Sequence, residues 1–407
     1  MRQYFFLLAA FLLAVSCGGG RKSNQSSDNN GADSCIVEGD VYRGPVTIYI
    51  DDKLVPLYDT LTLDNMIESV RYIPLETSDS SLIDAVNVRK IDDIYCVASS
   101  FLNSMVKLFD SNGRYIRNVF RVGRARDEIS NSSTFKINTS GREIIANSIS
   151  TRKYVFFNLD SLTYRTVYND KFKIFPFYPL GKGHYVALPR NNRPVNGSTI
   201  TETYDSLPHL MFYDSNLNIT GTAGYGAKPW RDLETTVIPR LSSEILESGD
   251  GVIYRYVDGD TVYTVDADER MVPAVILDIP GKLKPTIRQA EVDPASRKEQ
   301  MIYVQYFQLS RDYVFIEYQY GGEDYSGIWS RDSGKLLYLN KTPGLSGLNT
   351  VLVSVDGYTT QFYVHYLNRR DNEIIFAVNP SFLVGIIPGL KADDNPVIME
   401  MTLRSGM

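Results

Sequence analysis

The chain has 407 residues and a formal net charge of −6, with an isoelectric point near 5.3. This mildly acidic balance argues against a nucleic-acid-binding protein, which needs a basic face. The 28 tyrosines favour β-strands over helices.

Residues 1–16 have the pattern of a signal peptide. Arg2 is followed by an apolar run at residues 5–15, which is shorter than the ~20 residues that span a bilayer. The run ends in AVSC, which resembles the lipobox of bacterial lipoproteins, although that box more often begins with Leu. The resemblance implies cleavage before Cys17 and attachment of acyl chains such as palmitate, and two or more chains anchor a protein stably. An ordinary secretory peptide with a chance cysteine is the alternative.

Residues 17–34 are expected to form a lipidated tether. The segment GGGRKSNQSSDNNGADS lacks aromatic residues and cannot bury enough apolar surface to fold. As a flexible chain it would reach roughly 23 Å. Surface-exported relatives often carry acidic residues after the cysteine, whereas Arg21 and Lys22 stand here. We therefore expect an outer-membrane anchor, with the periplasmic face favoured over the cell surface.

The remainder predicts an all-β fold, because short β-rich runs alternate with Asp, Asn and Gly turns. A unit of strand, acidic turn and strand recurs every ~50 residues, the period of propeller blades. We predict an N-terminal extension at residues 35–67 that packs on a six-bladed β-propeller of four-stranded antiparallel blades at residues 68–404. The turn residues, each expected to bond its own backbone, are Asp110, Asp160, Asp214, Asp266, Asp332 and a weaker sixth copy, Asn379.

Both ends of the expected propeller carry recognisable motifs. DNMIESVRYIPLET (64–77), FDSNGRYIR (109–117) and DDNPVI (393–398) resemble a family of six-bladed propeller lipoproteins from Gram-negative gut-type bacteria, related to NHL-repeat propellers. The loop at residues 124–129 departs from the family, which has a Gly- and Pro-rich stretch there. The resemblance implies that the ends share one blade, so we expect residues 70–75 to pair beside residues 397–403 and close the ring.

Three loops on the face opposite the acidic turns are the candidate binding loops, at residues 121–128, 188–208 and 225–234. Loops longer than ~15 residues are often functional, and aromatic and Arg side chains suit sugar rings and carboxylates. We therefore predict binding of a glycan, a peptide or an envelope protein. Solvated loops are the alternative. The candidate residues are Arg121, Arg124, Arg126, Arg190, Arg193, Lys228, Trp230 and Arg231.

The residues favour a binding or scaffolding protein over an enzyme. His184, His209 and His365 are the only histidines, and no zinc or nucleophile-elbow motif occurs. We therefore predict no catalytic residue, metal or cofactor. A propeller hydrolase or lyase at the channel mouth is the alternative, which clustered carboxylates or converging histidines would favour. Cys96 lies in a buried-strand pattern and is expected to be a free thiol, although pairing with Cys35 is open.

Overall fold

The computed structural model describes residues 44–407 except for 52, 84–86, 99–105, 131–132, 149–151, 169–176, 189–207, 226–243, 249–250, 256–258, 280–301, 321–322, 343–349, 364–365 and 368–370. The expected signal peptide, Cys17, the tether and Cys35 lie outside the described residues. The described elements are strands and one short 3-10 helix, η2 (Pro380–Phe382). Among the described residues, no helix is long and apolar enough to cross a membrane.

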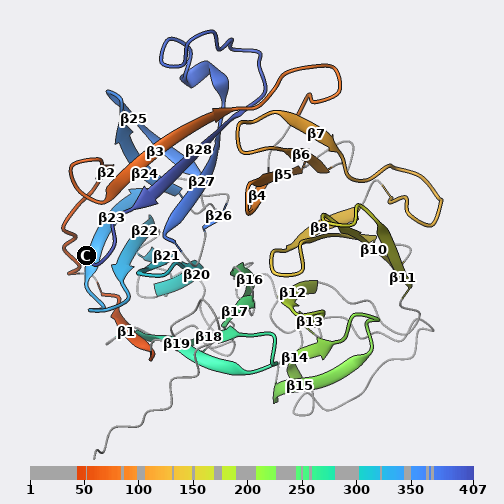
Figure 1. The fold of residues 1–407 in the computed structure, drawn as a ribbon. Helices are drawn as coiled ribbons and strands as arrows, with labels where there is room; N and C mark the ends of the chain where they lie inside the picture. Colours follow the sequence, from red (N-terminus) through yellow and green to blue (C-terminus); the bar gives the residue numbers. More distant parts are fainter. Residues whose placement is uncertain are drawn as a thin grey trace, which may run out of the picture. The chain divides into compact units, whose positions relative to one another are not determined.

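Five blades follow one another around a ring, and each is an antiparallel sheet with its strands paired in chain order (Figure 1). The first blade contains β4 (Asn87–Ile91), β5 (Ile94–Ala98), β6 (Val106–Phe109) and β7 (Tyr115–Asn118), and the second contains β8 (Ser133–Asn138), β9 (Glu143–Ser148), β10 (Lys153–Asn158) and β11 (Tyr164–Tyr168). The third contains β12 (Phe177–Gly181), β13 (His184–Ala187), β14 (Pro208–Tyr213) and β15 (Ile219–Tyr225). The fourth contains β16 (Glu244–Ser248), β17 (Gly251–Arg255), β18 (Thr261–Val265) and β19 (Met271–Asp278), and the fifth contains β20 (Ile302–Leu309), β21 (Tyr313–Tyr320), β22 (Glu323–Ser330) and β23 (Leu336–Thr342).

The sixth blade joins two distant parts of the chain. It contains β26 (Tyr366–Leu367), β27 (Glu373–Val378), β28 (Val397–Leu403) and, as its last strand, β3 (Ile67–Pro74). β3 and β28 are antiparallel, with Val70 opposite Met401 and Pro74 opposite Val397. This register confirms the predicted ring closure and, with it, the six-bladed propeller of four-stranded blades.

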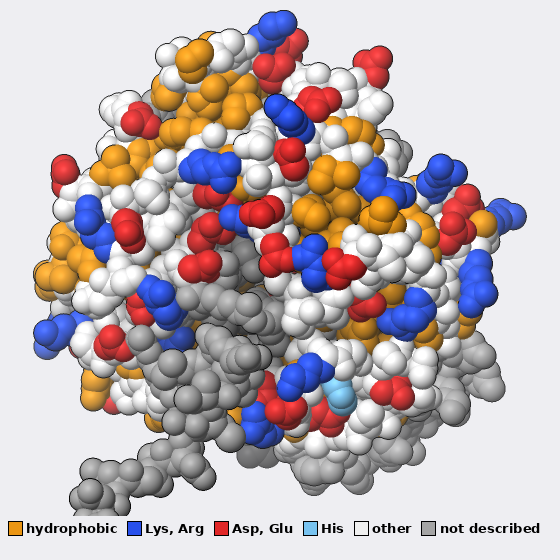
Figure 2. Space-filling model, in the orientation of Figure 1, with side chains coloured by type: hydrophobic (Ala, Val, Ile, Leu, Met, Phe, Trp, Pro, Cys, Tyr) orange, Lys and Arg blue, Asp and Glu red, His pale blue; other side chains and the backbone are white. Residues whose placement is uncertain are grey.

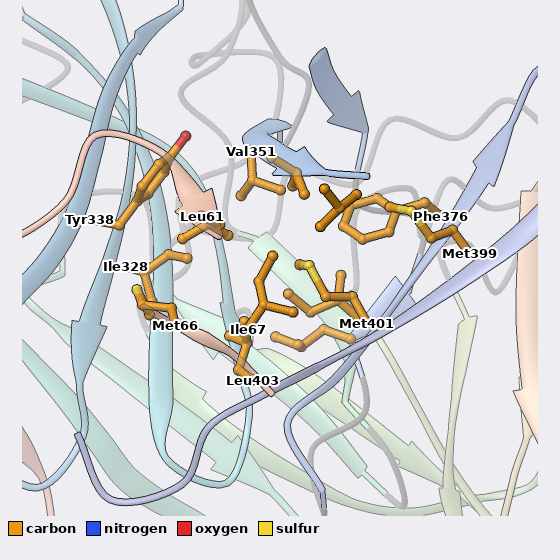
Figure 3. Close-up of a cluster of buried hydrophobic side chains, with 14 of the residues drawn as sticks. Leu61, Met66, Ile67, Ile328, Tyr338, Val351, Phe376, Met399, Met401 and Leu403 are labelled. Carbon is orange, nitrogen blue, oxygen red and sulfur yellow. The ribbon is translucent and has the colours of Figure 1, made fainter. Parts of the chain in front are cut away.

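The closing strands pack on a core that both parts of the chain supply. Ile67 of β3 lies beside Met401 and Leu403 of β28, and Phe376 of β27 completes the group (Figure 3). All four side chains are buried. Because each fully buried large apolar side chain contributes about 1.5–3 kcal/mol, apolar packing supports the closure in addition to the strand hydrogen bonds.

Residues 46–62 run along the outer edges of neighbouring sheets. β1 (Val46–Tyr49) pairs in parallel with β19, and Tyr58 forms a parallel bridge with Tyr338 of β23. β2 (Leu61–Thr62) pairs in parallel with β24 (Thr350–Val355). β24 and β25 (Tyr358–Tyr363) form a hairpin that follows the fifth blade in the chain. Neither the parallel strands nor the hairpin was predicted.

The acidic turns of the first, third and fourth blades have the predicted geometry. The carboxylate of Asp110 accepts hydrogen bonds from the backbone N–H groups of Asn112 and Arg114, both at 2.9 Å. Asp214 and Asp266 accept the equivalent two bonds in their own turns. These turns connect the third strand of each blade to its fourth, as expected.

In the second and fifth copies the prediction selected the wrong residue, whereas the sixth residue, Asn379, bonds its own backbone but in a different kind of turn. Asn158, not Asp160, accepts the backbone hydrogen bonds in the second blade, and Ser330 precedes Asp332 as the first residue of the fifth turn. Asn379 caps η2 and lies between β27 and β28, so its turn connects the second and third strands of the sixth blade. A turn equivalent to the others is missing there because β3 comes from the opposite part of the chain.

Cys96 lies in β5 and is a buried free thiol, as predicted. Its burial among apolar side chains disfavours the thiolate and raises the pKa of Cys96 to about 12. The thiol therefore serves as a small apolar side chain in the core between the first and second blades.

Candidate functional site

The loop between β7 and β8 presents three exposed arginines, Arg121, Arg124 and Arg126, and we name residues 121–128 the Arg loop. It connects the first blade to the second, which places it on the face opposite the acidic turns, as expected. Within the described part of the chain, none of the three guanidinium groups forms an ion pair. Two acids, Asp127 and Glu128, accompany the three arginines, so the loop carries one excess positive charge.

The ends of the Arg loop are fastened to each other. Val122 and Ile129 form a parallel bridge, and the N–H of Ile129 donates to the carbonyl of Arg121 at 2.9 Å. Ile129 is buried and anchors the loop in the core between the first two blades. Inside the loop, the carboxylate of Glu128 accepts a hydrogen bond from the N–H of Ala125 at 2.8 Å. Glu128 therefore supports the loop backbone from within.

Two side chains of the second blade donate hydrogen bonds to the backbone of the Arg loop. The ammonium group of Lys153 in β10 donates to the carbonyls of Ala125 and Glu128, the latter at 2.5 Å. The hydroxyl of Thr166 in β11 donates to the carbonyl of Arg126 at 2.7 Å. Burial lowers the pKa of Lys153 despite the nearby acids. The backbone that carries the arginines is thus fixed before any ligand binds, which reduces the entropy cost of binding.

Arginine is suited to recognise anions because its planar group donates two parallel hydrogen bonds to a carboxylate, sulfate or phosphate. Three such groups within six residues present several donors to one extended ligand. The Arg loop is therefore a preformed cationic surface. The other candidate residues, Cys17, Arg190, Arg193, Lys228, Trp230 and Arg231, lie outside the described residues.

A second charged group lies inside the ring, where the first strands of the blades face one another (Figure 1). Glu247 of β16 forms ion pairs with Arg89 of β4 and Lys136 of β8, both at 3.3 Å. The carboxylate of Glu247 thus connects the fourth blade to the first and second blades at the centre of the ring. The ammonium group of Lys136 also lies 3.9 Å from the ring centre of Tyr178 in β12.

In this central group, both Lys136 and Glu247 are charged. Burial alone would lower the pKa of Lys136, but Glu247 outweighs burial and raises it. Burial would likewise raise the pKa of Glu247, but Lys136 and Arg89 lower it. Sequence reasoning missed this group. The signal that was present is a charged residue inside each of three first strands, Arg89 in β4, Lys136 in β8 and Glu247 in β16.

A third charged group joins the first blade to the sixth. Lys90 of β4 donates to Glu373 of β27 at 3.0 Å and to Glu400 of β28, which also accepts from the hydroxyl of Tyr95 at 2.5 Å. Arg71 of β3 lies 3.4 Å from the same carboxylate. Figure 2 shows basic and acidic side chains gathered together near the middle of the face that is turned to the viewer.

This third group contains two neighbouring carboxylates, the kind of arrangement that glycoside hydrolysis requires. Burial and the charge of Glu400 raise the pKa of Glu373, whereas hydrogen bonds to Glu400 and Glu373 raise the pKa of Lys90 against the effect of burial. Both acids are already bound by the lysine, and their side chains are at most 15% exposed. The group therefore has the character of an ion-pair clamp between blades.

The histidines give no sign of a metal site in the part of the chain described. His184 Nδ1 lies 3.1 Å from Glu269, in the fourth blade's acidic turn, and the side chains of His209 and His365 lie outside the description. Among the described residues, no group of three or more His, Cys, Asp or Glu could hold a metal ion.

Comparison with protein-family models places the chain. The model described as "Domain of unknown function (DUF4934)" matches residues 47–402. The chain belongs to the DUF4934 family. A search of curated proteins found no match.

Solved structures similar to this DUF4934 protein have the same fold. An exported protein from Bacteroides fragilis NCTC 9343 matches with a TM-score of 0.59 and 16% identity, over 88% of this chain and 99% of that chain. A DUF4221 protein from Bacteroides vulgatus ATCC 8482 matches with a TM-score of 0.50 and 9% identity, over 84% and 98% of the two chains. At these identities the likeness establishes the propeller fold alone.

Proposed function

We propose that this DUF4934 protein is an exported, lipid-anchored propeller that binds an acidic glycan of the cell envelope through the Arg loop. The observation that carries the proposal is the set of three exposed arginines without an acidic partner among the described residues, on a backbone held by Glu128, Lys153 and Thr166.

The sequence supports a location in the envelope. Residues 1–16 have signal-peptide character and Cys17 ends a lipobox-like motif. The similar protein from Bacteroides fragilis is described as exported. A tether of roughly 23 Å would keep the propeller near one membrane, so a partner would be an envelope component such as an acidic glycan, with a peptide or protein as the alternative. The periplasmic face of the outer membrane is part of the proposal.

The test compares three immobilised probes for capture of the purified full-length protein. Polygalacturonate represents an acidic glycan, dextran a neutral glycan and polyglutamate an acidic peptide. We expect retention on polygalacturonate and none on dextran, with binding reduced by salt because exposed charges are screened. Retention on polyglutamate alone would replace the glycan with a peptide partner. Equal retention on dextran, or none on either acidic probe, would refute an anion-binding Arg loop.

A further inference from the structure

The connection between β27 and β28 gives the sixth blade an exposed apolar surface (Figure 1). It spans residues 379–396, and connections longer than ~15 residues are often functional. The side chains of Phe382, Val384 and Ile386 are 50%, 49% and 36% exposed. Figure 2 shows hydrophobic side chains gathered at the top of the view, where Figure 1 has this connection. We name residues 380–390 the apolar loop.

The apolar loop is supported by its own backbone and by the core beneath it. The N–H groups of Leu383 and Val384 both donate to the carbonyl of Pro380, at 2.8 and 3.1 Å. Those of Ile386 and Ile387 both donate to the carbonyl of Leu383, at 3.0 and 3.1 Å. Leu383 is buried in the core that holds the ring closure, and Ile387 packs against the same core. The three exposed side chains therefore project from a preformed support.

The composition of the apolar loop suits a lipid surface better than a protein partner. Residues 379–390 contain no charged side chain, and charged side chains are costly to bury in lipid. The N–H groups that bond within the loop do not lose a water partner when the loop contacts lipid. Protein interfaces depend instead on Trp, Tyr and Arg, none of which occurs in this stretch. A lipid surface is therefore the partner that these residues favour.

We propose that the apolar loop docks the propeller on the phospholipid surface of its own membrane, with its three exposed side chains inserted between the headgroups. This inference rests on the proposed anchor at Cys17, because a tether of roughly 23 Å would hold the propeller close to that surface. One positive and two negative charges follow the loop, at Lys391, Asp393 and Asp394. Apolar contact, and not attraction to anionic lipid, therefore drives docking. Docking should persist at high salt, which weakens binding at the Arg loop.

The test measures how bromine on the acyl chains of vesicles quenches tryptophan fluorescence. Full-length protein is mixed with phosphatidylethanolamine–phosphatidylglycerol vesicles, brominated or not, and the signal of the two native tryptophans is subtracted. The emission of Phe382→Trp should fall at least twofold, because side chains that dock on a bilayer reach ~5–10 Å into the boundary between headgroups and acyl chains. Leu162→Trp is the matched control, since Leu162 is 54% exposed in the turn between β10 and β11 on the opposite face. Its emission should stay unchanged.

Two double substitutions separate lipid docking from a general effect of apolar surface. Adding Val384→Ser and Ile386→Ser to Phe382→Trp should remove the quenching. Adding Ile116→Ser and Ile219→Ser instead should leave it unchanged, because these side chains are 46% and 45% exposed on the last strands of other blades. All four side chains are exposed, so both proteins should keep the melting temperature of the wild type.

Co-sedimentation with the vesicles and the intact mass test the anchor separately. If the acylated protein sediments but Phe382→Trp is not quenched, docking is overturned and the anchor stands. If Phe382→Trp is quenched in a protein without acyl chains, the anchor fails and docking stands. Equal quenching of Phe382→Trp and Leu162→Trp overturns docking. Docking is also overturned if Val384→Ser with Ile386→Ser dissociates a dimer in analytical ultracentrifugation and no quenching occurs, because the partner is then a second copy of the chain.

Discussion

Glu247 in the fourth blade and Arg89 in the first blade form an ion pair at the centre of the ring, with 3.3 Å between Glu247 Oε2 and Arg89 Nε. The two residues are 158 positions apart in the chain, so the contact exists only when the ring has formed. The same ring formation brings Lys90 of the first blade onto Glu373 and Glu400 of the sixth. These two charged groups thus form only in the closed ring, which β3 and β28 complete.

Lys90→Met should destabilise the fold by about 3 kcal/mol, because it leaves two largely buried carboxylates without their shared cation. Urea denaturation at neutral pH would measure the loss. Lys341→Gln is the matched control, since Lys341 forms a lysine–glutamate pair of the same 3.0 Å length at an exposed position, and it should leave stability unchanged. Similar losses in the two variants would contradict a clamp at the blade junction.

Glu247 and Glu373 should respond to pH in opposite directions. Burial opposes the charge of Glu247, but Lys136 and Arg89 lower its pKa in the folded state. Glu247 therefore contributes stability above its unfolded value of 4.5, and the contribution is lost as the pH falls through its folded value. Burial and Glu400 raise the pKa of Glu373, so its ionised form opposes folding near neutral pH and its protonation on acidification relieves that cost.

The measurement is the free energy of unfolding of both glutamine variants at about pH 7 and about pH 3.5. The loss of unfolding free energy caused by Glu247→Gln should be larger at the higher pH. The loss caused by Glu373→Gln should be larger at the lower pH. The assignment of the two environments fails if both costs change in the same direction.

Gly113→Ala should destabilise the junction of the first and sixth blades. Gly113 has a φ of +79°, and an added Cβ would lie 2.2 Å from the carbonyl oxygen of Pro74, at the end of β3. Gly357→Ala is the control, because Gly357 has a φ of +75° with nothing within 4 Å of the added atom. We expect about 1 kcal/mol for the conformation alone at Gly357 and at least about 3 kcal/mol at Gly113. Equal losses of stability in the two variants would mean that the backbone near Pro74 shifts to make room for the added methyl group.

Cys17→Ala should leave the protein either soluble or with its signal peptide uncleaved, since the acyl chains at Cys17 are the proposed anchor. Fractionation of the producing bacterium and the intact mass of the protein would show this, and Cys35→Ala is the control that should remain anchored. Protease treatment of intact cells tests the periplasmic orientation, which predicts protection. An acyl-free wild-type mass would contradict the anchor.

The ring closure and three of the acidic turns were predictable because their signals are local. YIPLET and DDNPVI mark the strand ends, and an Asp at the start of a turn bonds the backbone two and four residues later. The second turn was misassigned because Asn158 performs the same role two residues before Asp160. The parallel strand β1 and the pairing of Arg89 with Glu247 depend on segments far apart in the sequence, and no local pattern distinguishes them from ordinary surface strands and charges.

The Arg loop was predictable as a cluster of arginines, but its rigidity was not. Lys153 supports the loop from a strand of the second blade, 28 residues from its partner Ala125, and its sequence position is that of an ordinary strand lysine. Such support turns a solvated loop into a candidate binding surface.

The most direct test of glycan binding is the affinity for polygalacturonate of two triple variants with the same change in charge. The first carries Arg121→Gln, Arg124→Gln and Arg126→Gln, and the second carries Arg114→Gln, Lys182→Gln and Lys335→Gln in exposed turns on the opposite face. The Arg loop predicts that the first variant loses at least tenfold in affinity while the second loses less than twofold. Equal losses in the two variants would show that net charge, and not the Arg loop, determines binding.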